Sequence, residues 1–180
     1  MPRSKRWLVP PIALLACACA PAGASAATET QIARAAQADT AVALAERDEA
    51  RRVQRRERRV LRRVLAAATR QIGDAYASGA GGPDAFDCSG LTAAAFAQAG
   101  ITLIHQSAAQ ARQGTAVDFH SQPIRPGDLV FQDTDGDGII NHVGIAVSES
   151  TWIHSRSASL PVAFGAMPAK SKIVAVRRFL

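Results

Sequence analysis

The sequence is poor in three features: cysteine, long apolar runs and, over one long stretch, glycine and proline. Cysteine occurs only at positions 17, 19 and 88, so cleavage of the N-terminal segment would leave one thiol, which excludes an internal disulfide. The apolar run near the N-terminus, residues 7–20, is too short to span a bilayer comfortably. Residues 28–72 contain neither glycine nor proline, so nothing interrupts a helix there and we expect one over 28–68.

The N-terminal segment has the organisation of an export signal. A short basic region precedes the apolar run, and the small residues at 24–26 form a cleavage site. Residues 1–26 are therefore predicted to direct export to the periplasm or the extracellular space. A second interpretation stays open, because residues 14–17, Leu-Leu-Ala-Cys, are similar to a lipoprotein signal that ends at Cys17. In that case the protein is anchored to a membrane through a lipid on Cys17.

The charge of the chain is concentrated in its first third. Residues 1–63 carry 13 basic and 6 acidic residues, a net charge of +7, whereas residues 64–180 carry a net charge of −1. The basic excess therefore does not indicate nucleic-acid binding by the folded part, and we expect no nucleic-acid partner. Residues 27–65 are predicted to form a basic helical arm. The simpler interpretation is a solvated stalk, and the alternative is an arm that binds anionic wall or membrane polymers.

The composition changes at Gly73, where glycine, proline and aromatic residues appear and short apolar runs replace the long periodicity. Helices are predicted near residues 89–99 and 106–113, and strands near 128–132, 141–147, 150–155 and 172–178. Helices first and strands after are typical of an α+β domain. We assign residues 66–180 to this domain.

Cys88 and two histidines are candidates for nucleophilic catalysis. Cys88 lies between a Gly/Pro/Asp loop and a strong helix-forming segment, so it is expected at a helix N-terminus, where unpaired N–H groups favour a thiolate and lower the thiol pKa. His142 begins one predicted strand and His154 ends the next. If the two strands pair antiparallel, the imidazoles lie side by side, and His154 can orient His142 as the base.

The chain resembles the NlpC-type cysteine peptidases over residues 66–180. Upstream of Cys88 stand a tyrosine at position 76, a glycine at 79 and a proline at 83, and the motif Phe-Asp-Cys-Ser-Gly-Leu covers residues 86–91. Three further blocks follow in the family's order: Pro-Gly-Asp-Leu-Val-Phe at 126–131, His-Val-Gly-Ile at 142–145 and Trp-Ile-His at 152–154. The resemblance implies a papain-like α+β fold, with the cysteine-bearing helix packed on an antiparallel sheet.

The resemblance also implies roles for individual residues. Cys88 is expected to be the nucleophile, His142 the base and His154 the orienting residue. Asp87 and Ser89 are expected to bind the free amine of a substrate peptide, and Tyr76 to line the cleft. The implied reaction is hydrolysis of the γ-D-glutamyl–diamino acid bond in the stem peptides of peptidoglycan, without a cofactor.

Some features leave alternatives open. Ala75, Ser78 and Ala80 depart from the family's pattern, which puts the shape of the substrate cleft in doubt. An amidase or transacylase on the same scaffold, or a non-enzymatic wall-binding protein, are the alternative functions. Residues 133–138 match the start of a calcium loop, but Gly144 stands where the loop's bidentate acid is required. We therefore predict a tight turn there and no metal site.

Overall fold

A computed structural model describes residues 26–180, and of residues 26, 27 and 29 it describes only the backbone. Apart from its last residue, the predicted export signal, with Cys17, lies outside the described residues. The chain divides into two compact units, Met1–Asp48 and Glu49–Leu180. In the described part of the chain, no helix is both long and apolar enough to cross a membrane.

Helix α1, Ala26–Arg70, runs through the glycine-free stretch and is slightly longer than predicted. Side chains described before residue 60 are exposed, whereas Val64, Ala67 and Ala68 are buried in the core of the second unit. The helix ends before Gly73, whose φ of 98° is favoured by glycine and turns the chain towards the sheet. The last turns of α1 thus belong structurally with the sheet, so the arm expected over 27–65 does not coincide with a compact unit. The proposed boundary of the domain at residue 66 stays a prediction.

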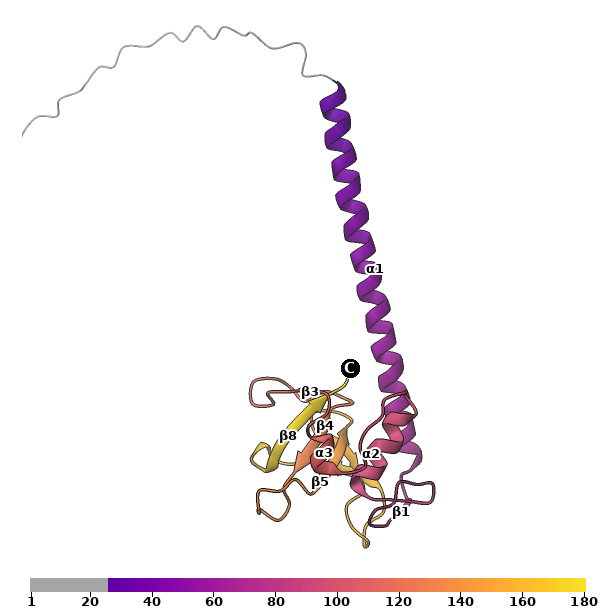
Figure 1. Cartoon of the computed structure of the whole chain (residues 1–180), viewed down its shortest axis with the longest axis vertical. Helices are drawn as coiled ribbons and strands as arrows, with labels where there is room; N and C mark the ends of the chain where they lie inside the picture. Colours follow the sequence, from indigo (N-terminus) through magenta and orange to yellow (C-terminus); the bar gives the residue numbers. More distant parts are fainter. Residues whose placement is uncertain (1–25) are drawn as a thin grey trace, which may run out of the picture. The chain divides into compact units, whose positions relative to one another are not determined.

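The second unit is built on a six-stranded antiparallel sheet of order β3-β8-β4-β5-β6-β7. Strands β3, β4, β5 and β8 of this sheet are labelled in Figure 1. Its strands are β3 (Thr115–Ala116), β4 (Leu129–Gln132), β5 (His142–Ala146), β6 (Thr151–His154), β7 (Ala163–Ala166) and β8 (Ile173–Arg178). A 3₁₀ turn, η1 (Lys170–Lys172), precedes β8. Two helices, α2 (Cys88–Ala97) and α3 (Ser107–Gln110), precede the long strands, and β1 (Ala75–Tyr76) and β2 (Ala85–Phe86) form a separate parallel pair. The α+β class and the cysteine-bearing helix are therefore confirmed.

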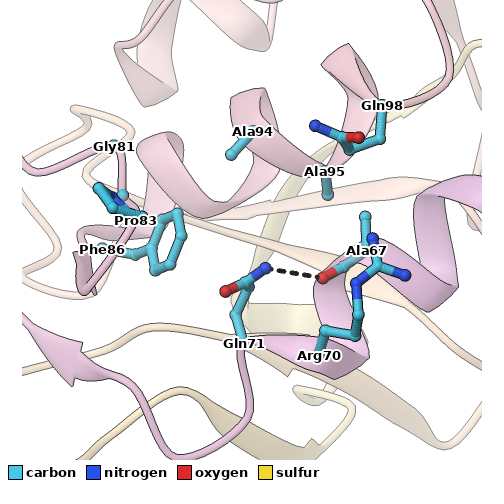
Figure 2. Close-up of a pocket in the computed structure, with 10 residues that line it drawn as sticks. Ala67, Arg70, Gln71, Gly81, Pro83, Phe86, Ala94, Ala95 and Gln98 are labelled. Carbon is cyan, nitrogen blue, oxygen red and sulfur yellow. Dashed lines mark hydrogen bonds between the residues drawn. The ribbon is translucent and has the colours of Figure 1, made fainter.

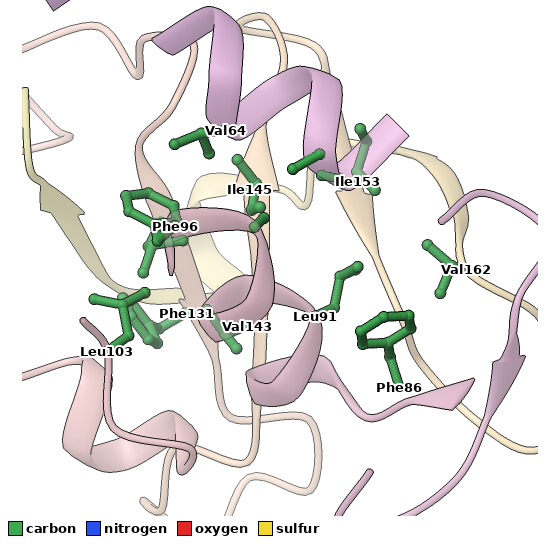
Figure 3. Close-up of a cluster of buried hydrophobic side chains, with 14 of the residues drawn as sticks. Val64, Phe86, Leu91, Phe96, Leu103, Phe131, Val143, Ile145, Ile153 and Val162 are labelled. Carbon is green, nitrogen blue, oxygen red and sulfur yellow. The ribbon is translucent and has the colours of Figure 1, made fainter. Parts of the chain in front are cut away.

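The sheet separates two apolar layers. The larger layer contains Val64 of α1, Leu91 and Phe96 of α2, and residues of the sheet such as Val143 and Ile145 (Figure 3). Helix α2 packs against β5 on this side. The smaller layer, on the other face, includes Val117, Val130, Ala146, Trp152 and Val176. Because successive residues of a strand point to opposite faces, His142 shares the face of Ala146, away from α2.

An ion pair with a buried carboxylate fixes the start of β4. Asp128 is almost fully buried and accepts hydrogen bonds from Nε and Nη2 of Arg178 on β8, at 2.8 and 2.7 Å. Its Oδ2 also accepts the N–H of Arg125 at 2.8 Å. The carboxylate holds the guanidinium in its charged form and raises the pKa of Arg178. In this chain the aspartate of the Pro-Gly-Asp-Leu-Val-Phe block thus joins the start of β4 to β8.

Candidate active site

Cys88 is the first residue of α2, and Asp87 caps the helix. The backbone of Asp87 is extended, with φ −86° and ψ 179°, and its Oδ1 accepts the N–H of Gly90 at 2.6 Å. Asp is among the preferred N-cap residues because its short carboxylate satisfies an unpaired N–H of the first turn. Leu91 donates its N–H to the carbonyl of Asp87 at 3.0 Å. The sequence Asp-Cys-Ser-Gly therefore places the thiol at the helix start, as expected.

A buried polar cluster braces the first turn of α2 from behind. Gln110 of α3 is fully buried, and its amide donates to the carbonyls of Ser89 and Ile104 at 2.9 and 2.8 Å. Its Oε1 accepts the hydroxyl of Thr92 at 2.7 Å. Both N–H groups of this amide and one lone pair of its oxygen are hydrogen-bonded. Gln110 therefore fixes the turn that carries Cys88. Nothing in the sequence singled out this glutamine.

The sulfur of Cys88 lies against the backbone on both sides of His142. Sγ is 3.9 Å from the carbonyl oxygen of Asn141 and accepts a hydrogen bond from the N–H of Val143. Backbone pairing between β5 and β6 covers only Ile145 with Ile153 and Ala146 with Trp152. The thiol thus approaches β5 at the end where β6 no longer pairs with it.

The expected lowering of the thiol pKa is wrong for this site. Burial raises the pKa of Cys88 above its ordinary value, and the negative charge of Asp87 raises it further. The N–H groups of Val143, Ser89 and Cys88 act in the opposite direction but do not compensate. The helix terminus favours the thiolate, as argued from sequence, but the loss of water around the sulfur outweighs it. The free protein therefore carries a neutral thiol at pH 7.

His142 and His154 contact each other on the face of the sheet away from α2. Nε2 of His142 lies 2.9 Å from Nδ1 of His154. Trp152 contacts both rings: it stacks on His154 with centroids 4.6 Å apart and meets His142 edge-on at 5.4 Å. The antiparallel pairing of β5 and β6 that was expected from sequence is observed. Trp152 stood in the motif, but its role in holding both imidazoles was not predicted.

Both imidazoles are neutral at pH 7. Burial lowers the pKa of His142 to about 4, and the neighbouring charges of His154 and Arg156 contribute in the same direction. Burial and Arg156 lower the pKa of His154 to about 4. A neutral imidazole can accept a proton, so His142 is in the form that a general base requires.

Glycines make room for this ring cluster. A Cβ at Gly144 would lie 2.5 Å from the Trp152 ring, and a Cβ at Gly165 would lie 2.7 Å from Nε2 of His154. Gly165 is opposite Trp152 in the pairing of β6 with β7. The two glycines on either side of β6 therefore set the positions of the indole and the second imidazole.

Ser155 connects the two parts of the site. Its buried hydroxyl donates to the carbonyl of Phe86 at 2.7 Å. Phe86 lies two residues before Cys88, and Ser155 follows His154 directly. This single bond ties the end of β6 to the segment that leads into the nucleophile helix. The sequence offered no signal for it.

The residues expected to bind substrate lie next to Cys88. Oδ1 of Asp87 is occupied by the N–H of Gly90, the hydroxyl of Ser89 at 3.0 Å and Nε2 of His105 at 2.9 Å. Its Oδ2 accepts the N–H of Gly79 at 2.9 Å and retains lone pairs. Burial alone would raise the pKa of Asp87, but these hydrogen bonds, that of Gly90 first, hold it below its ordinary value. The contact of His105 with Asp87 was not predicted from the sequence.

Tyr76 is half-buried in β1, and its backbone pairs with Phe86. This pairing brings the tyrosine to the segment that precedes the nucleophile. Its expected place beside the thiol stays a prediction.

A hollow of 760 Å³ adjoins His154. Its lining includes Trp152, Arg156 and Lys172 but not His142. Asp133 and Asp135 of the loop after β4 also line it. A different pocket, of 360 Å³, lies between the end of α1 and α2, is lined by residues such as Gln71 and Phe86, and contains none of the candidate catalytic residues (Figure 2).

Residues 133–138 form a turn stabilised by its own backbone. Oδ1 of Asp133 accepts the N–H groups of Asp135 and Gly136, at 3.1 and 2.7 Å, and its Oδ2 accepts that of Gly138 at 2.7 Å. These backbone donors occupy the carboxylate that a cation would need. Within residues 26–180 no three acidic, histidine or cysteine side chains gather as a metal site would require.

The fold and the site together define an α+β protein of the papain-like class, in which a cysteine at a helix start lies against the strand that carries His142. The NlpC/P60 family model matches residues 73–174. The chain belongs to the NlpC/P60 family.

Curated relatives support this assignment. A probable endopeptidase of Mycobacterium tuberculosis is 37% identical over 116 residues, which cover 64% of this chain and 29% of that protein. A probable endopeptidase p60 of Listeria seeligeri is 45% identical over 93 residues, covering 52% of this chain and 17% of that protein. The match thus spans less than a third of the length of these two relatives.

Solved structures show the same fold. An NlpC/P60 family protein from Bacillus cereus superposes with a TM-score of 0.61 at 28% identity, covering 67% of this chain and 40% of that one. The peptidoglycan hydrolase RipB from Mycobacterium tuberculosis gives a TM-score of 0.57 at 25% identity, covering 67% and 65% of the two chains. These neighbours confirm the papain-like architecture expected from the resemblance.

Proposed function

We propose that this protein is a peptidoglycan endopeptidase that hydrolyses the γ-D-glutamyl–diamino acid bond of stem peptides through Cys88. Two contacts carry the proposal: the Cys88 sulfur lies against the backbone beside His142, and the His142 ring contacts His154. The probable endopeptidases and the peptidoglycan hydrolase among its relatives support the reaction class.

The first step transfers the thiol proton to His142 while sulfur attacks the scissile carbonyl. Because Nε2 of His142 contacts His154, the thiol proton is accepted by Nδ1 of His142. The N–H at Nε2 of His142 donates a hydrogen bond to Nδ1 of His154. The imidazolium that forms is then stabilised by this hydrogen bond. Since both groups start neutral, the proton moves in concert with attack rather than from a preformed ion pair. The backbone N–H groups at the start of α2 receive the developing oxyanion.

The tetrahedral intermediate collapses when His142 gives the proton to the leaving amine of the diamino acid. The γ-glutamyl group remains on sulfur as a thioester. Water then attacks the thioester, with His142 again as base, and the carboxylic acid product leaves as the thiol recovers its proton. No cofactor is needed for these steps.

Substrate recognition on the acyl side uses the residues around Asp87. A free ammonium at the end of a short stem peptide pairs with Oδ2 of Asp87, the oxygen with the spare lone pairs. Ser89, which hydrogen-bonds to Asp87, orients the carboxylate, and Tyr76 covers the peptide. The low pKa of Asp87 keeps this group charged at pH 7.

The leaving side is directed towards the hollow beside His154. Its lining contains both signs of charge, Arg156 and Lys172 against Asp133 and Asp135. The amino-acid end of a diamino acid carries an ammonium and a carboxylate, which this lining matches. The hollow therefore supports a peptide substrate of the proposed kind.

The alternative functions differ in the product that they release. An amidase on the same scaffold cuts between glycan and peptide, a transacylase passes the acyl group to another amine, and a wall-binding protein releases nothing. The intact Cys88, His142 and His154 disfavour the last. The carboxylate of Asp87, placed for a peptide amine, favours the endopeptidase over the amidase.

Digestion of purified peptidoglycan, with mass analysis of the soluble fragments, tests the proposal. We expect fragments that end in γ-D-glutamate and fragments with a new free amine on the diamino acid, and we expect none from Cys88→Ala, whose fold is checked by circular dichroism. Free intact stem peptides would instead identify an amidase. Near-normal release by Cys88→Ala would contradict the mechanism.

The proposed substrate requires export. We propose that residues 1–26 direct the chain to the periplasm or the cell exterior, either by cleavage after Ala26 or by lipidation of Cys17. Mass measurement of the mature protein from membrane and soluble fractions distinguishes the two routes. A mature chain that retains Met1 would contradict both.

A further inference from the structure

The second unit carries a dense row of arginines that the catalytic mechanism does not use. Eight arginines lie between positions 51 and 63 of α1, and all are exposed. At 1.5 Å per residue they occupy about 18 Å of helix. The acidic residues from Glu49 to Arg63 are only Glu49 and Glu57.

These arginines cover one side of α1, beside and opposite the stripe that faces the core. With 3.6 residues per turn they span an arc of about 160°, which begins next to the stripe formed by Val60, Val64 and Ala67 and ends on the far side of the helix. Val64 and Ala67 are buried in the larger apolar layer, and Val60 is half-buried against it. The core therefore holds this part of the helix with its arginine face outward.

The charges are not neutralised within the described chain. Among the side chains that the structure describes, the only ion pairs are His105 with Asp87 and Arg178 with Asp128. Five pairs of arginines are spaced i,i+4, beginning with Arg51 and Arg55, and like charges at this spacing destabilise a helix. A ligand that brings negative charge to this face relieves the repulsion.

The surface between these side chains is concave. A hollow of 580 Å³ is lined by six arginines of α1, among them Arg52 and Arg55. A second hollow, of 440 Å³, is lined by Arg59, Arg62, Arg63 and Arg70 and reaches Gln98 of α2. Guanidinium groups that surround a hollow are suited to bidentate binding of phosphate or carboxylate oxygens.

We propose that this arginine face, residues 51–63, is a binding site for a repeating polyanion of the cell wall, with phosphodiester or carboxylate groups along its length. A lipid surface fits less well. Helices that lie in a membrane interface insert an apolar face with large side chains, and the apolar side of residues 60–67 is already used by the core. The choice of a wall polymer rests on the proposed function, whereas binding to a soluble polyphosphate does not.

The test uses the full-length mature protein and two matched variants. One replaces Arg51, Arg55, Arg58 and Arg62 by glutamine, and the other replaces the same four by lysine. Both replacement residues are good helix formers, so the comparison isolates charge. Binding is measured against long-chain inorganic polyphosphate over a range of salt concentrations. Hydrolysis of a small soluble stem peptide is measured in parallel and is expected to be the same for all three proteins.

Wild type and the lysine variant are expected to bind polyphosphate with affinity that falls steeply with salt. The slope of log affinity against log salt should be lower by roughly 3 for the glutamine variant, since each lost cation removes about 0.7–0.9 of slope. Equal affinity and slope for all three proteins would overturn the site. Normal peptide hydrolysis in that case would leave the proposed function intact.

Binding to sacculi identifies the polymer. Wild type should bind sacculi that carry their phosphodiester polymers more tightly than sacculi stripped of them, and the glutamine variant should not distinguish the two. Tighter binding to phosphatidylglycerol vesicles than to intact sacculi, at matched phosphate concentration, would overturn the wall-polymer assignment in favour of a membrane.

Discussion

The thiol of Cys88 and the imidazoles of His142 and His154 have one property in common: each is buried away from water. Burial raises the pKa of Cys88 and lowers those of His142 and His154, so each group is held in its neutral form. In the proposed mechanism, the substrate carbonyl is the electrophile whose reaction with sulfur moves the thiol proton to His142. Reactivity towards substrate therefore depends on the geometry of the bound complex more than on thiolate in the free protein.

The two histidines are expected to contribute unequally to catalysis. His142→Ala removes the proton acceptor and should lower kcat/KM on a soluble stem peptide by several orders of magnitude, because members of a triad act as a unit. His154→Ala should lower it less, since water can replace part of its hydrogen bond to His142. Steady-state kinetics with folded variants measures both. Equal losses would show that His154 has a larger role than orientation.

Arg156 is expected to set the lower pH limit of activity. Its positive charge lowers the pKa of both imidazoles, and His142 must be neutral to act as a base. Arg156→Gln should therefore raise the pKa of His142 and move the acidic limb of the kcat/KM profile upward from about pH 4. Arg156→Lys, which keeps the charge, should leave the limb in place. A limb at the same pH in all three proteins would exclude this electrostatic effect.

At the scale of elements, β5 and β7 make room for the rings of the site through glycines, Gly144 and Gly165. Gly144 is two residues after His142 on the same face of β5, where the Trp152 ring takes the space of a Cβ. The absence of a side chain allows an indole to pack against His142 and His154. The packing of the rings thus depends on a glycine that takes no part in the chemistry.

Gly144→Ala is expected to disturb catalysis through this packing. Its Cβ would lie 2.5 Å from the Trp152 ring and 2.9 Å from the carbonyl oxygen of Ile153, so the ring and the strand must shift. Such displacement should lower kcat by about 10- to 100-fold and destabilise the fold by about 1–3 kcal/mol.

Gly81→Ala is the matched control, because its Cβ meets only His105 at an ordinary 3.5 Å. Kinetics and denaturant unfolding measure the two effects. Unchanged kcat in Gly144→Ala would mean that the rings adapt without loss of geometry.

The elements that the sequence predicted well are those with strong local signals. The glycine-free stretch predicted α1, and the Asp-Cys-Ser-Gly motif predicted the start of α2. The short apolar runs predicted β4, β5, β6 and β8. Strand β7 was missed because Ala163–Ala166 contains alanine and glycine in place of β-branched residues, and it forms through pairing with β6. The helix predicted at 106–113 is only one turn, Ser107–Gln110, and the chain turns at Gly114, with φ 69°.

The candidate site was predictable where the chemistry is local in sequence. The spacing of His142 and His154 on successive strands was enough to expect their contact. The roles of Gln110 and Ser155 were not predictable, because their bonds to Thr92, Ser89 and Phe86 join residues 18 to 69 positions apart, which only the tertiary fold brings together. The direction of the Cys88 pKa failed for the same reason, since burial by β5 is not encoded in the residues around the cysteine.

At the scale of the whole molecule, the buried histidines make the fold sensitive to acid. The pKa of His142 is about 4 in the folded protein and about 6.5 in an unfolded chain. The unfolded state therefore binds more protons between these values, and the free energy of unfolding falls as pH decreases from 6.5 towards 4. For His142, which is 5% exposed, the loss between pH 7 and pH 4.5 should be about 2–3 kcal/mol, at 1.36 kcal/mol per pH unit.

Denaturant unfolding between pH 7 and pH 4.5 measures this loss. The window lies above the pKa of an aspartate in an unfolded chain, about 3.9, so the stabilisation that Asp87, Asp118 and Asp133 gain from their lowered folded pKa stays almost complete down to pH 4.5. The double variant His142→Gln/His154→Gln should show a flatter dependence on pH, because neither glutamine side chain titrates. A wild-type protein as stable at pH 4.5 as at pH 7 would require the two imidazoles to be solvated, and hence an active site more open than the one described.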